Sequence, residues 1–348
     1  QAVGLEAINL LDYRVIIGIF IGGMLTFLFS AFTMESVSKA AYKMIEEVRR
    51  QFRADKGILS FGLGDWYDYG DFRAGFSRNT PVPLVATAHY YMTVMYLVQA
   101  AKMVGNDFDI RYYTSLAQEI MVAFNKCFLH KDTAQYGTGS QCSNALPLFL
   151  QMTQDADEQD NYRPDADLNE KVFANLIKDV EAHGNRLTTG DVGNRYLIQT
   201  LARNGEHELI YKMFNHEEAP GYGFQLKFGA TTLTEQWDPR QGSSWNHFMM
   251  GQIDEWFFNS LVGIRPSTTP KQGYQKFIIA PQPVGDLKYV KASYETLYGT
   301  INVDWTCENG TFTLNVSVPV NTTAVVYLPG EKEPKEIQSG TYQLVCAK

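Results

Sequence analysis

The sequence has few cysteines, and none of them is spaced as a metal ligand pair. Four occur among 348 residues, at positions 127, 142, 307 and 346, and no two form a C-x-x-C motif. A zinc site or a disulfide framework is therefore not indicated, and we expect buried free thiols and no cofactor.

Basic residues are also in short supply. The chain has 30 Lys and Arg against 38 Asp and Glu, which gives a net charge of −8. A nucleic-acid-binding surface needs an excess of basic residues, so nucleic acid is not expected as a partner. Aromatic residues are plentiful at 13%, in keeping with a carbohydrate site.

Charge is absent altogether from residues 16–32. Gly18 and Gly22 in this run have the small-x-x-x-small spacing that lets membrane helices pack closely, and the run is nearly long enough to span a bilayer. A signal peptide fits poorly because Glu6 and Asp12 precede it. An amphipathic helix is expected next, with an apolar stripe made of Val37, Ala40, Ala41, Met44, Ile45 and Val48.

From about residue 80 the apolar residues recur with a helical period. A helix is expected to open at Thr80-Pro81 and close at Gly105, and another should cover 111–128. Asp167 and Glu170 resemble a capping box at the start of a third helix. Further helices are expected at 196–203, 206–214 and 247–262, so the region should consist of helical hairpins.

After residue 266 the period changes to two. Short runs rich in Val, Thr, Tyr and Ile predict strands, and Asn309-Gly310 predicts a hairpin turn between two of them. The predicted strands are 290–294, 300–305, 311–318 and 323–328. We therefore expect a small antiparallel β-sandwich, with the change from helices to strands between about 263 and 276.

One carboxylate lies among aromatic and hydrogen-bonding side chains. Glu235 is the only acid in residues 221–237, within the run T-T-L-T-E-Q-W-D. Rings cover the apolar faces of a sugar while polar side chains bond its hydroxyls, so Glu235 is a candidate general base or nucleophile. The alternative is a loop whose glutamate is solvated and whose tryptophans belong to the core. The neighbouring residues of interest are Tyr222, Trp237, Trp245 and His247.

The order of these motifs resembles the bacterial α-L-rhamnosidases of glycoside hydrolase family 78. The similar segments run in the same order from about residue 59 to the C-terminus and include G-D-V-G at 190–193, G-Y-G at 221–223, 229–238, Asn246-His247 and 251–256. The resemblance implies a mainly α fold with an all-β C-terminal domain. Residues 57–266 would form the later part of an (α/α)6 barrel, and residues 267–348 the β-sandwich.

The resemblance also implies roles for individual residues. Glu235 would be the general base that activates water for attack with inversion, and His247 would bond the rhamnose hydroxyls. Asp65-Trp66 resembles the loop that lays an indole against the sugar, although Trp66 is also compatible with a core position. Tyr222, Trp237 and Trp245 would help to shape the pocket, whereas Glu255 and Trp256 are expected to be structural.

The first 56 residues depart from that family. Ser30–Met34 and Glu47–Arg53 resemble a segment of the membrane-bound, ion-pumping inorganic pyrophosphatases, but none of the acidic metal-pyrophosphate motifs of those pumps is present. We interpret residues 1–56 as a foreign segment in an apparent chimera. A natural membrane anchor is the alternative, and membrane association is expected only in that case.

The expected function is hydrolysis of terminal α-L-rhamnosyl residues, with rhamnose-containing glycans or glycosides as substrates. In the family the general acid lies upstream of the Gly-Asp-Trp loop, a region without a counterpart here, so the chain should be inactive or weakly active alone. Another six-hairpin glycosidase and a non-catalytic carbohydrate-binding fragment are the alternatives. A bacterial protein is expected, with the periplasm and the cytoplasm equally compatible.

Overall fold

The computed structural model describes residues 12–54, 57–71, 75–156, 162–241, 244–267 and 273–348. The chain divides into two units, residues 1–59 and residues 60–348.

The N-terminal unit contains one long helix, α1 (Tyr13–Ala54). Its apolar side chains are exposed, including Phe20 at 74% and Phe27 at 79%. Residues Tyr13–Met44 are long and apolar enough to cross a membrane by length and composition alone. The uncharged run and the amphipathic helix expected after it form one continuous helix, whereas the side chains of Ile45 and Val48 in the predicted stripe lie outside the described residues.

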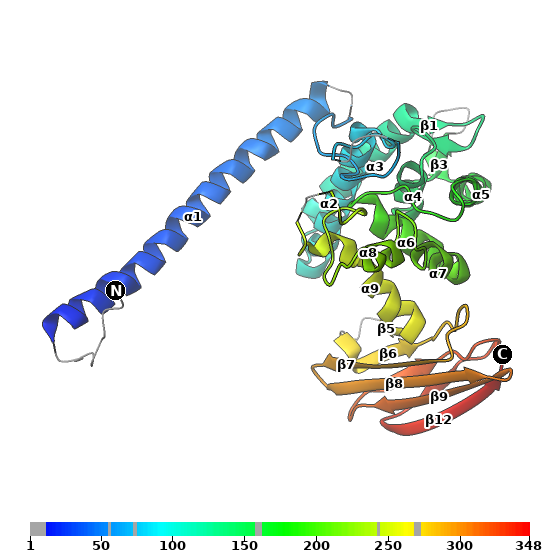
Figure 1. The fold of residues 1–348 in the computed structure, drawn as a ribbon. Helices are drawn as coiled ribbons and strands as arrows, with labels where there is room; N and C mark the ends of the chain where they lie inside the picture. Colours follow the sequence, from blue (N-terminus) through cyan, green and yellow to red (C-terminus); the bar gives the residue numbers. More distant parts are fainter. Residues whose placement is uncertain (1–11, 55–56, 72–74, 157–161, 242–243, 268–272) are drawn as a thin grey trace. The chain divides into compact units, whose positions relative to one another are not determined.

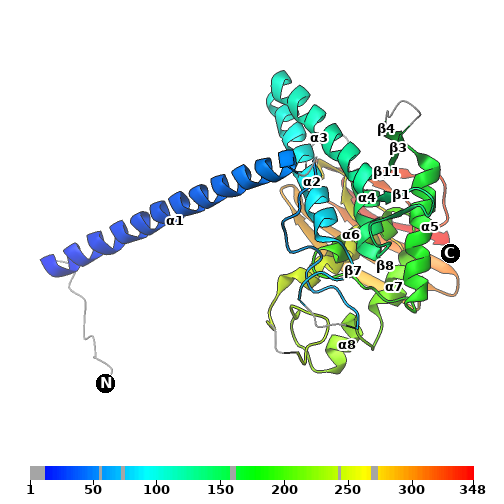
Figure 2. The ribbon, with the colours of Figure 1, turned by 90° about the horizontal axis from the view of Figure 1, so that it is seen from above.

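The second unit begins with helical hairpins (Figures 1 and 2). In one row, α2 packs against α4, α4 against α6 and α6 against α9. Three further helices pack on this row: α3 on α2, α5 on α4 and α7 on α6. These contacts produce two rows of helices, as hairpins that share a barrel wall require. The bounds are α2 (Val82–Val104), α3 (Asp107–Phe128), α4 (Gln141–Phe149), α5 (Ala166–Ala182), α6 (Gly193–Arg203), α7 (His207–Phe214), α8 (Tyr222–Lys227), η1 (Phe248–Gln252), α9 (Ile253–Trp256) and η2 (Phe257–Val262).

Helix ends show where local signals were sufficient. α2 follows Pro81 and ends at Gly105, whose φ of 71° is left-handed, as predicted. α3 begins earlier than predicted because the Asn106 side chain caps it. The predicted capping box at Asp167 is wrong, because the Asp165 side chain accepts the Leu168 N–H at 3.0 Å and starts α5.

Some elements were not predicted at all. Helix α4 is short, contains Pro147 and is buried along almost its whole length, so it shows no amphipathic period. Two small hairpins connect the helices, formed by β1 (Leu129–His130) with β2 (Gln135–Tyr136) and by β3 (Gln154–Ala156) with β4 (Tyr162–Pro164).

The C-terminal part consists of two four-stranded sheets, with strand orders β11-β10-β6-β5 and β12-β9-β8-β7. Asn309 and Gly310, with φ of 50° and 76°, form the predicted turn between β8 and β9. The pair β6–β10 is parallel, a difference from the expected purely antiparallel pairing. The strands are β5 (Ile264–Pro266), β6 (Lys276–Ile279), β7 (Tyr289–Thr296), β8 (Gly299–Glu308), β9 (Thr311–Val318), β10 (Thr323–Val326), β11 (Lys335–Ile337) and β12 (Gly340–Ala347); a 3-10 turn, η3 (Gly273–Gln275), precedes β6.

The sheets and the helices are directly joined. Trp305 of β8 is fully buried, and its Nε1–H donates to the Leu261 carbonyl of η2 at 2.9 Å. η2 ends at Val262 and β5 begins at Ile264. Residues 268–272, inside the predicted transition region, lie outside the described residues.

The cysteines only partly follow expectation. All four are free, but only Cys142 is buried, while Cys127 is exposed and the other two are half-buried. The expectation of buried thiols is therefore wrong for Cys127, because that position falls on a solvent-facing side of α3. Within the described residues, no group of three or more His, Cys, Asp or Glu side chains is arranged to hold a metal ion.

Candidate active site

Asp65 joins the loop before α2 to the start of α6. Its two carboxylate oxygens accept the backbone N–H groups of Gly190 at 3.0 Å and Gly193 at 2.7 Å. The side chain is completely buried, and burial raises its pKa to about 6 although both hydrogen bonds act in the opposite direction. Asp65 therefore supports the loop that carries Trp66, and its predicted contact with substrate stays a prediction.

The G-D-V-G motif allows these two loops to approach closely. A Cβ on Gly190 would lie 2.0 Å from the Trp66 carbonyl oxygen, and one on Gly193 would lie 2.6 Å from an Asp65 oxygen. Neither space can hold a methyl group, so glycine is required at both positions. The motif thereby positions Asp191, which lies between the two glycines.

Asp191 is held firmly by its backbone. Its N–H donates to the Trp66 carbonyl at 2.7 Å, and its own carbonyl accepts from Gln252 Nε2 at 2.6 Å. The side chain is 3% exposed, and its Oδ1 has no hydrogen-bond partner among the described residues. Burial, followed by the charges of Asp65 and Glu235, raises the pKa of Asp191 to about 7. A substantial fraction of Asp191 therefore carries a proton at neutral pH.

Glu235 lies in a loop that folds back on itself. Its backbone N–H donates to the Ser244 carbonyl at 2.9 Å, and its Oε2 accepts the Ser244 N–H at 3.0 Å. Further along, the His247 N–H donates to the Leu233 carbonyl at 2.9 Å. These bonds bring His247 back beside the segment that carries Glu235. Both side chains are half-buried, so both are open to a small molecule.

The His247 ring is only partly satisfied by its neighbours. It stacks on Phe248 with ring centroids 5.6 Å apart, and its Nδ1 has no hydrogen-bond partner among the described residues. This nitrogen is buried, so a sugar hydroxyl would have to bond the other ring nitrogen, Nε2. Its predicted role is compatible with this environment and stays a prediction.

Trp237 and Tyr222 lie behind the Glu235 loop. Trp237 is 1% exposed and donates its Nε1–H to the Thr189 carbonyl at 3.2 Å. The Tyr222 ring meets it edge to face at 5.3 Å, and the Tyr222 hydroxyl donates to the Met250 carbonyl. Both side chains are therefore placed to hold the loop, whereas Trp245 is 51% exposed and free to meet a ligand.

Trp66 is half-buried between two other rings. Tyr67 and Phe76 each meet it edge to face at 5.3 Å. Tyr67 has a positive φ of 59°, and burial together with the charges of Glu235 and Asp191 raises the pKa of its phenol. Tyr67 thus lies near both carboxyl groups. Sequence reasoning missed it, although it directly follows the Asp65-Trp66 pair.

Two further hydrogen bonds join the start of α2 to the start of α4 and the start of α6 to the end of η1. Thr80 and Ser140, at the starts of α2 and α4, share a bond of 2.8 Å between their hydroxyls, and Asn194 of α6 donates to Gln252 of η1 at 2.7 Å. The Asp191–Trp66 and Trp237–Thr189 hydrogen bonds bring the loops that carry Trp66, Asp191, Glu235 and His247 together near the start of α6. Here a carboxylate, a proton-bearing carboxyl and aromatic rings meet, which suits acid–base chemistry on a polyhydroxylated ligand.

Glu255 is engaged in an ion pair. It forms a two-pronged ion pair with Arg195, at 2.7 and 2.9 Å. The expectation that a neighbour satisfies Glu255 is confirmed.

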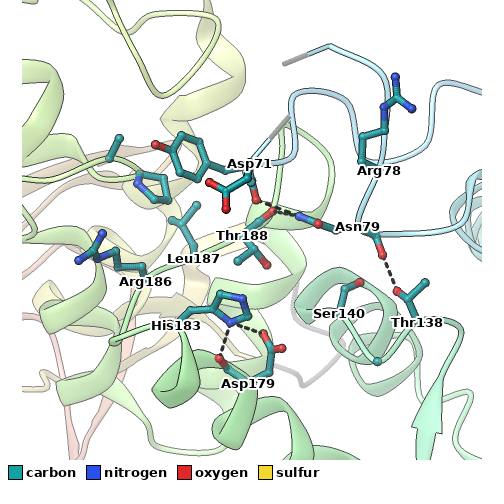
Figure 3. A pocket seen from close by; sticks show the side chains of 15 residues that line it. Asp71, Arg78, Asn79, Thr138, Ser140, Asp179, His183, Arg186, Leu187 and Thr188 are labelled. Atoms are coloured by element: carbon teal, nitrogen blue, oxygen red, sulfur yellow. Dashed lines mark hydrogen bonds and ion pairs between the residues drawn. The ribbon is translucent and has the colours of Figure 1, made fainter. Parts of the chain in front are cut away.

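A cavity of about 600 Å³ also opens beside Thr188 (Figure 3), but neither Glu235 nor His247 lines it.

Comparison with known families assigns the helical and the β parts of the chain. Residues 28–261 match the bacterial alpha-L-rhamnosidase 6 hairpin glycosidase domain, and residues 263–343 match the bacterial alpha-L-rhamnosidase C-terminal domain. This chain belongs to the bacterial α-L-rhamnosidase family. The predicted fold class, a six-hairpin glycosidase domain followed by a C-terminal β domain, is confirmed.

Individual rhamnosidases share this fold over part of their length. An α-L-rhamnosidase of Streptomyces avermitilis is 29% identical over 286 residues, which cover 80% of this chain and 25% of that protein. The structure of α-L-rhamnosidase from Dictyoglumus thermophilum has a TM-score of 0.74 at 30% identity, covering 86% of this chain and 35% of that one. A Streptomyces avermitilis enzyme complexed with L-rhamnose has a TM-score of 0.70 at 25% identity, covering 83% and 28%. The matched part of this chain spans between 25% and 32% of the length of four curated rhamnosidases.

The N-terminal segment is similar to a different family. A putative K(+)-stimulated pyrophosphate-energized sodium pump of Clostridium tetani is 59% identical over 59 residues, which are 17% of this chain and 9% of that protein. The chain therefore joins segments that are similar to two different families, as the sequence indicated.

Proposed function

We propose that residues 57–348 supply the general base of an inverting α-L-rhamnosidase that acts on terminal α-L-rhamnosyl residues. The observation that carries the proposal is the position of Glu235 in its folded-back loop, half-buried beside His247 and electrostatically close to Asp191. Membership of a rhamnosidase family and the relative with bound L-rhamnose favour this sugar.

The proposed chemistry assigns one task to each group. Glu235 accepts a proton from water as the water attacks the anomeric carbon from the face opposite the leaving oxygen. His247 bonds a sugar hydroxyl, and Trp66 and Trp245 cover an apolar face of the ring. The leaving oxygen needs a proton from an acid, and we infer that this chain does not itself supply the family's acid.

Asp191 is the second candidate for that acid. It is the carboxyl group beside Glu235 whose pKa of about 7 leaves it partly protonated at neutral pH. If Asp191 donated the proton, the chain would cleave poor leaving groups without any other carboxyl. The two possibilities predict opposite responses to the leaving group.

A leaving-group series tests both roles with the 348-residue chain. Dinitrophenolate leaves without protonation, whereas phenolate needs an acid whose loss costs about 10²–10⁴-fold. We expect 2,4-dinitrophenyl α-L-rhamnoside to be hydrolysed and phenyl α-L-rhamnoside to react slower by such a factor. The first sugar released should be the β-anomer, observed by NMR.

Glu235→Gln should lower hydrolysis of the dinitrophenyl substrate by at least about 100-fold while affinity for L-rhamnose is kept, because the amide cannot accept the proton. Glu119→Gln, on the exposed side of α3, is the matched control and should change nothing. Unchanged turnover in Glu235→Gln would remove Glu235 from the mechanism. Fast cleavage of the phenyl substrate that Asp191→Asn abolishes would make Asp191 the acid.

The same experiment separates the remaining alternatives. A non-catalytic carbohydrate-binding fragment would bind L-rhamnose equally well with and without the Glu235→Gln substitution, and would hydrolyse neither substrate. Another six-hairpin glycosidase would hydrolyse a dinitrophenyl glycoside of a different sugar faster than the rhamnoside.

A further inference from the structure

A second hollow lies beside the Glu235 region and has no role in the chemistry above. It measures about 600 Å³, within the range of ligand sites in proteins. Its walls come from residues 69–71 and 78–79, the turn at 138–140, the end of α5, the segment 186–188 before α6 and residues 219–220 (Figure 3). Segments that are distant from one another in the chain therefore build one concave surface.

The walls of this cavity are fixed to one another. Asn79 Nδ2 donates to the carbonyls of Tyr69 at 3.0 Å and Thr188 at 3.1 Å. Gln141, at the start of α4, accepts the Thr188 N–H at 2.8 Å and donates to the Arg186 carbonyl at 3.0 Å. A site with walls held in this way loses little conformational freedom when a ligand binds.

Charges of both signs line the cavity. Arg78 and Asp71 make no side-chain hydrogen bond to described residues, and Asp179 lies 3.3 Å from His183 at the end of α5 (Figure 3). Arg186 is already paired with Glu218 at 2.7 Å. A ligand with a net charge of either sign would face a like charge here, whereas a neutral ligand rich in hydroxyls can use both donors and acceptors.

The cavity also has an aromatic ring in its wall and lies next to the Glu235 loop. Tyr69 lines the cavity, and the pKa of its phenol is raised by burial and then by the charge of Asp238. Asp238 follows Glu235 by three residues, so the cavity adjoins the Glu235 loop. A phenol ring beside mixed polar groups suits the apolar face and the hydroxyls of a pyranose.

We propose that this cavity binds a neutral pyranose, the sugar unit next to the rhamnosyl residue on the leaving-group side. The leaving-group assignment rests on the proposed function, but binding of a neutral sugar does not. The two ideas can therefore fail separately.

Titration of the intact 348-residue chain tests the cavity. The probes are the methyl pyranosides of D-glucose, D-galactose and D-mannose, with D-glucuronate and D-glucosamine as charged counterparts, observed by saturation-transfer NMR. We expect at least one neutral glycoside to saturate the protein and both charged sugars to bind more weakly. No saturation by any neutral glycoside, or tighter binding of a charged sugar, would overturn the proposal.

Variants locate the binding. Tyr69→Leu removes the ring while keeping bulk, and Arg78→Gln removes an exposed charge. Each substitution should lower the affinity for the neutral sugar, by up to about tenfold, and Tyr69→Leu should have the larger effect. Arg111→Gln, exposed on α3 and absent from the cavity lining, is the control. Equal affinity in Tyr69→Leu and the parent chain would place the sugar elsewhere and refute the assignment.

Glu235→Gln separates this proposal from the proposed function. Neutral glycoside binding retained in Glu235→Gln supports a cavity distinct from the Glu235 position, and loss of that binding contradicts it. Glycoside binding without hydrolysis of any rhamnoside would leave the cavity standing while the proposed function fails.

Discussion

The Asp65 carboxylate accepts the Gly193 N–H at 2.7 Å, across 128 positions in the chain. Through this bond, the loop that carries Trp66 is fastened to the first turn of α6. A carboxylate at a helix N-terminus is favoured by the exposed N–H groups and by the helix dipole. This relationship explains why Asp65, a predicted sugar contact, is completely buried.

Asp65→Ala should destabilise the second unit by roughly 2–4 kcal/mol, because two buried N–H groups lose a charged acceptor. The measurement is the free energy of unfolding in urea, followed by tryptophan fluorescence. Asp65→Asn keeps one acceptor oxygen and should lose less. Equal stability of Asp65→Ala and the parent chain would show that the two hydrogen bonds do not hold the loops.

Gly190→Ala should be at least as damaging, by about 3 kcal/mol, because its methyl group would meet backbone that cannot move aside. The Cβ would lie 2.0 Å from the Trp66 carbonyl oxygen. Gly18→Ala, on the exposed surface of α1 with nothing within 4 Å, is the matched control and should lose no stability. The same urea unfolding measurement applies, and a neutral Gly190→Ala would contradict the close approach of the loops.

Asp191→Asn should become stabilising as the pH rises. The folded-state pKa of about 7 lies above the unfolded value of about 3.9, so the native Asp191 costs stability progressively between about pH 4 and pH 7. Asparagine does not ionise in this pH range, so the Asp191→Asn variant does not have this cost. Relative to the parent chain, the free energy of unfolding of Asp191→Asn should therefore rise by on the order of 3 kcal/mol between pH 4 and pH 8.

The control for that experiment is Asp132→Asn, an exposed turn residue. Its stability should follow the parent chain at every pH. If the curves of Asp191→Asn and the parent chain also run parallel, Asp191 does not keep its proton in the folded protein.

Local patterns in the sequence were enough for many elements. The end of α2 at Gly105 and the turn at Asn309-Gly310 depend on residues that adopt a positive φ at little cost, so neighbours in the chain decide them. The motif order around Glu235 was likewise sufficient for the family. Elements without a local signal were missed, and α4 is an example because it is buried almost all round and has no apolar face to detect.

The sequence by itself determined the fold class, the helical and β regions and the carboxylate of interest, because these follow from periodicity and from motifs of a few residues. Only the tertiary structure decided what each carboxyl group does. The Asp65 carboxylate accepts the backbone N–H groups of Gly190 and Gly193 at the start of α6. Asp191 is buried near Glu235 with an unpartnered oxygen and is partly protonated at neutral pH. Burial and neighbouring charge set these states, and both depend on loops that are distant in the chain and meet only after folding.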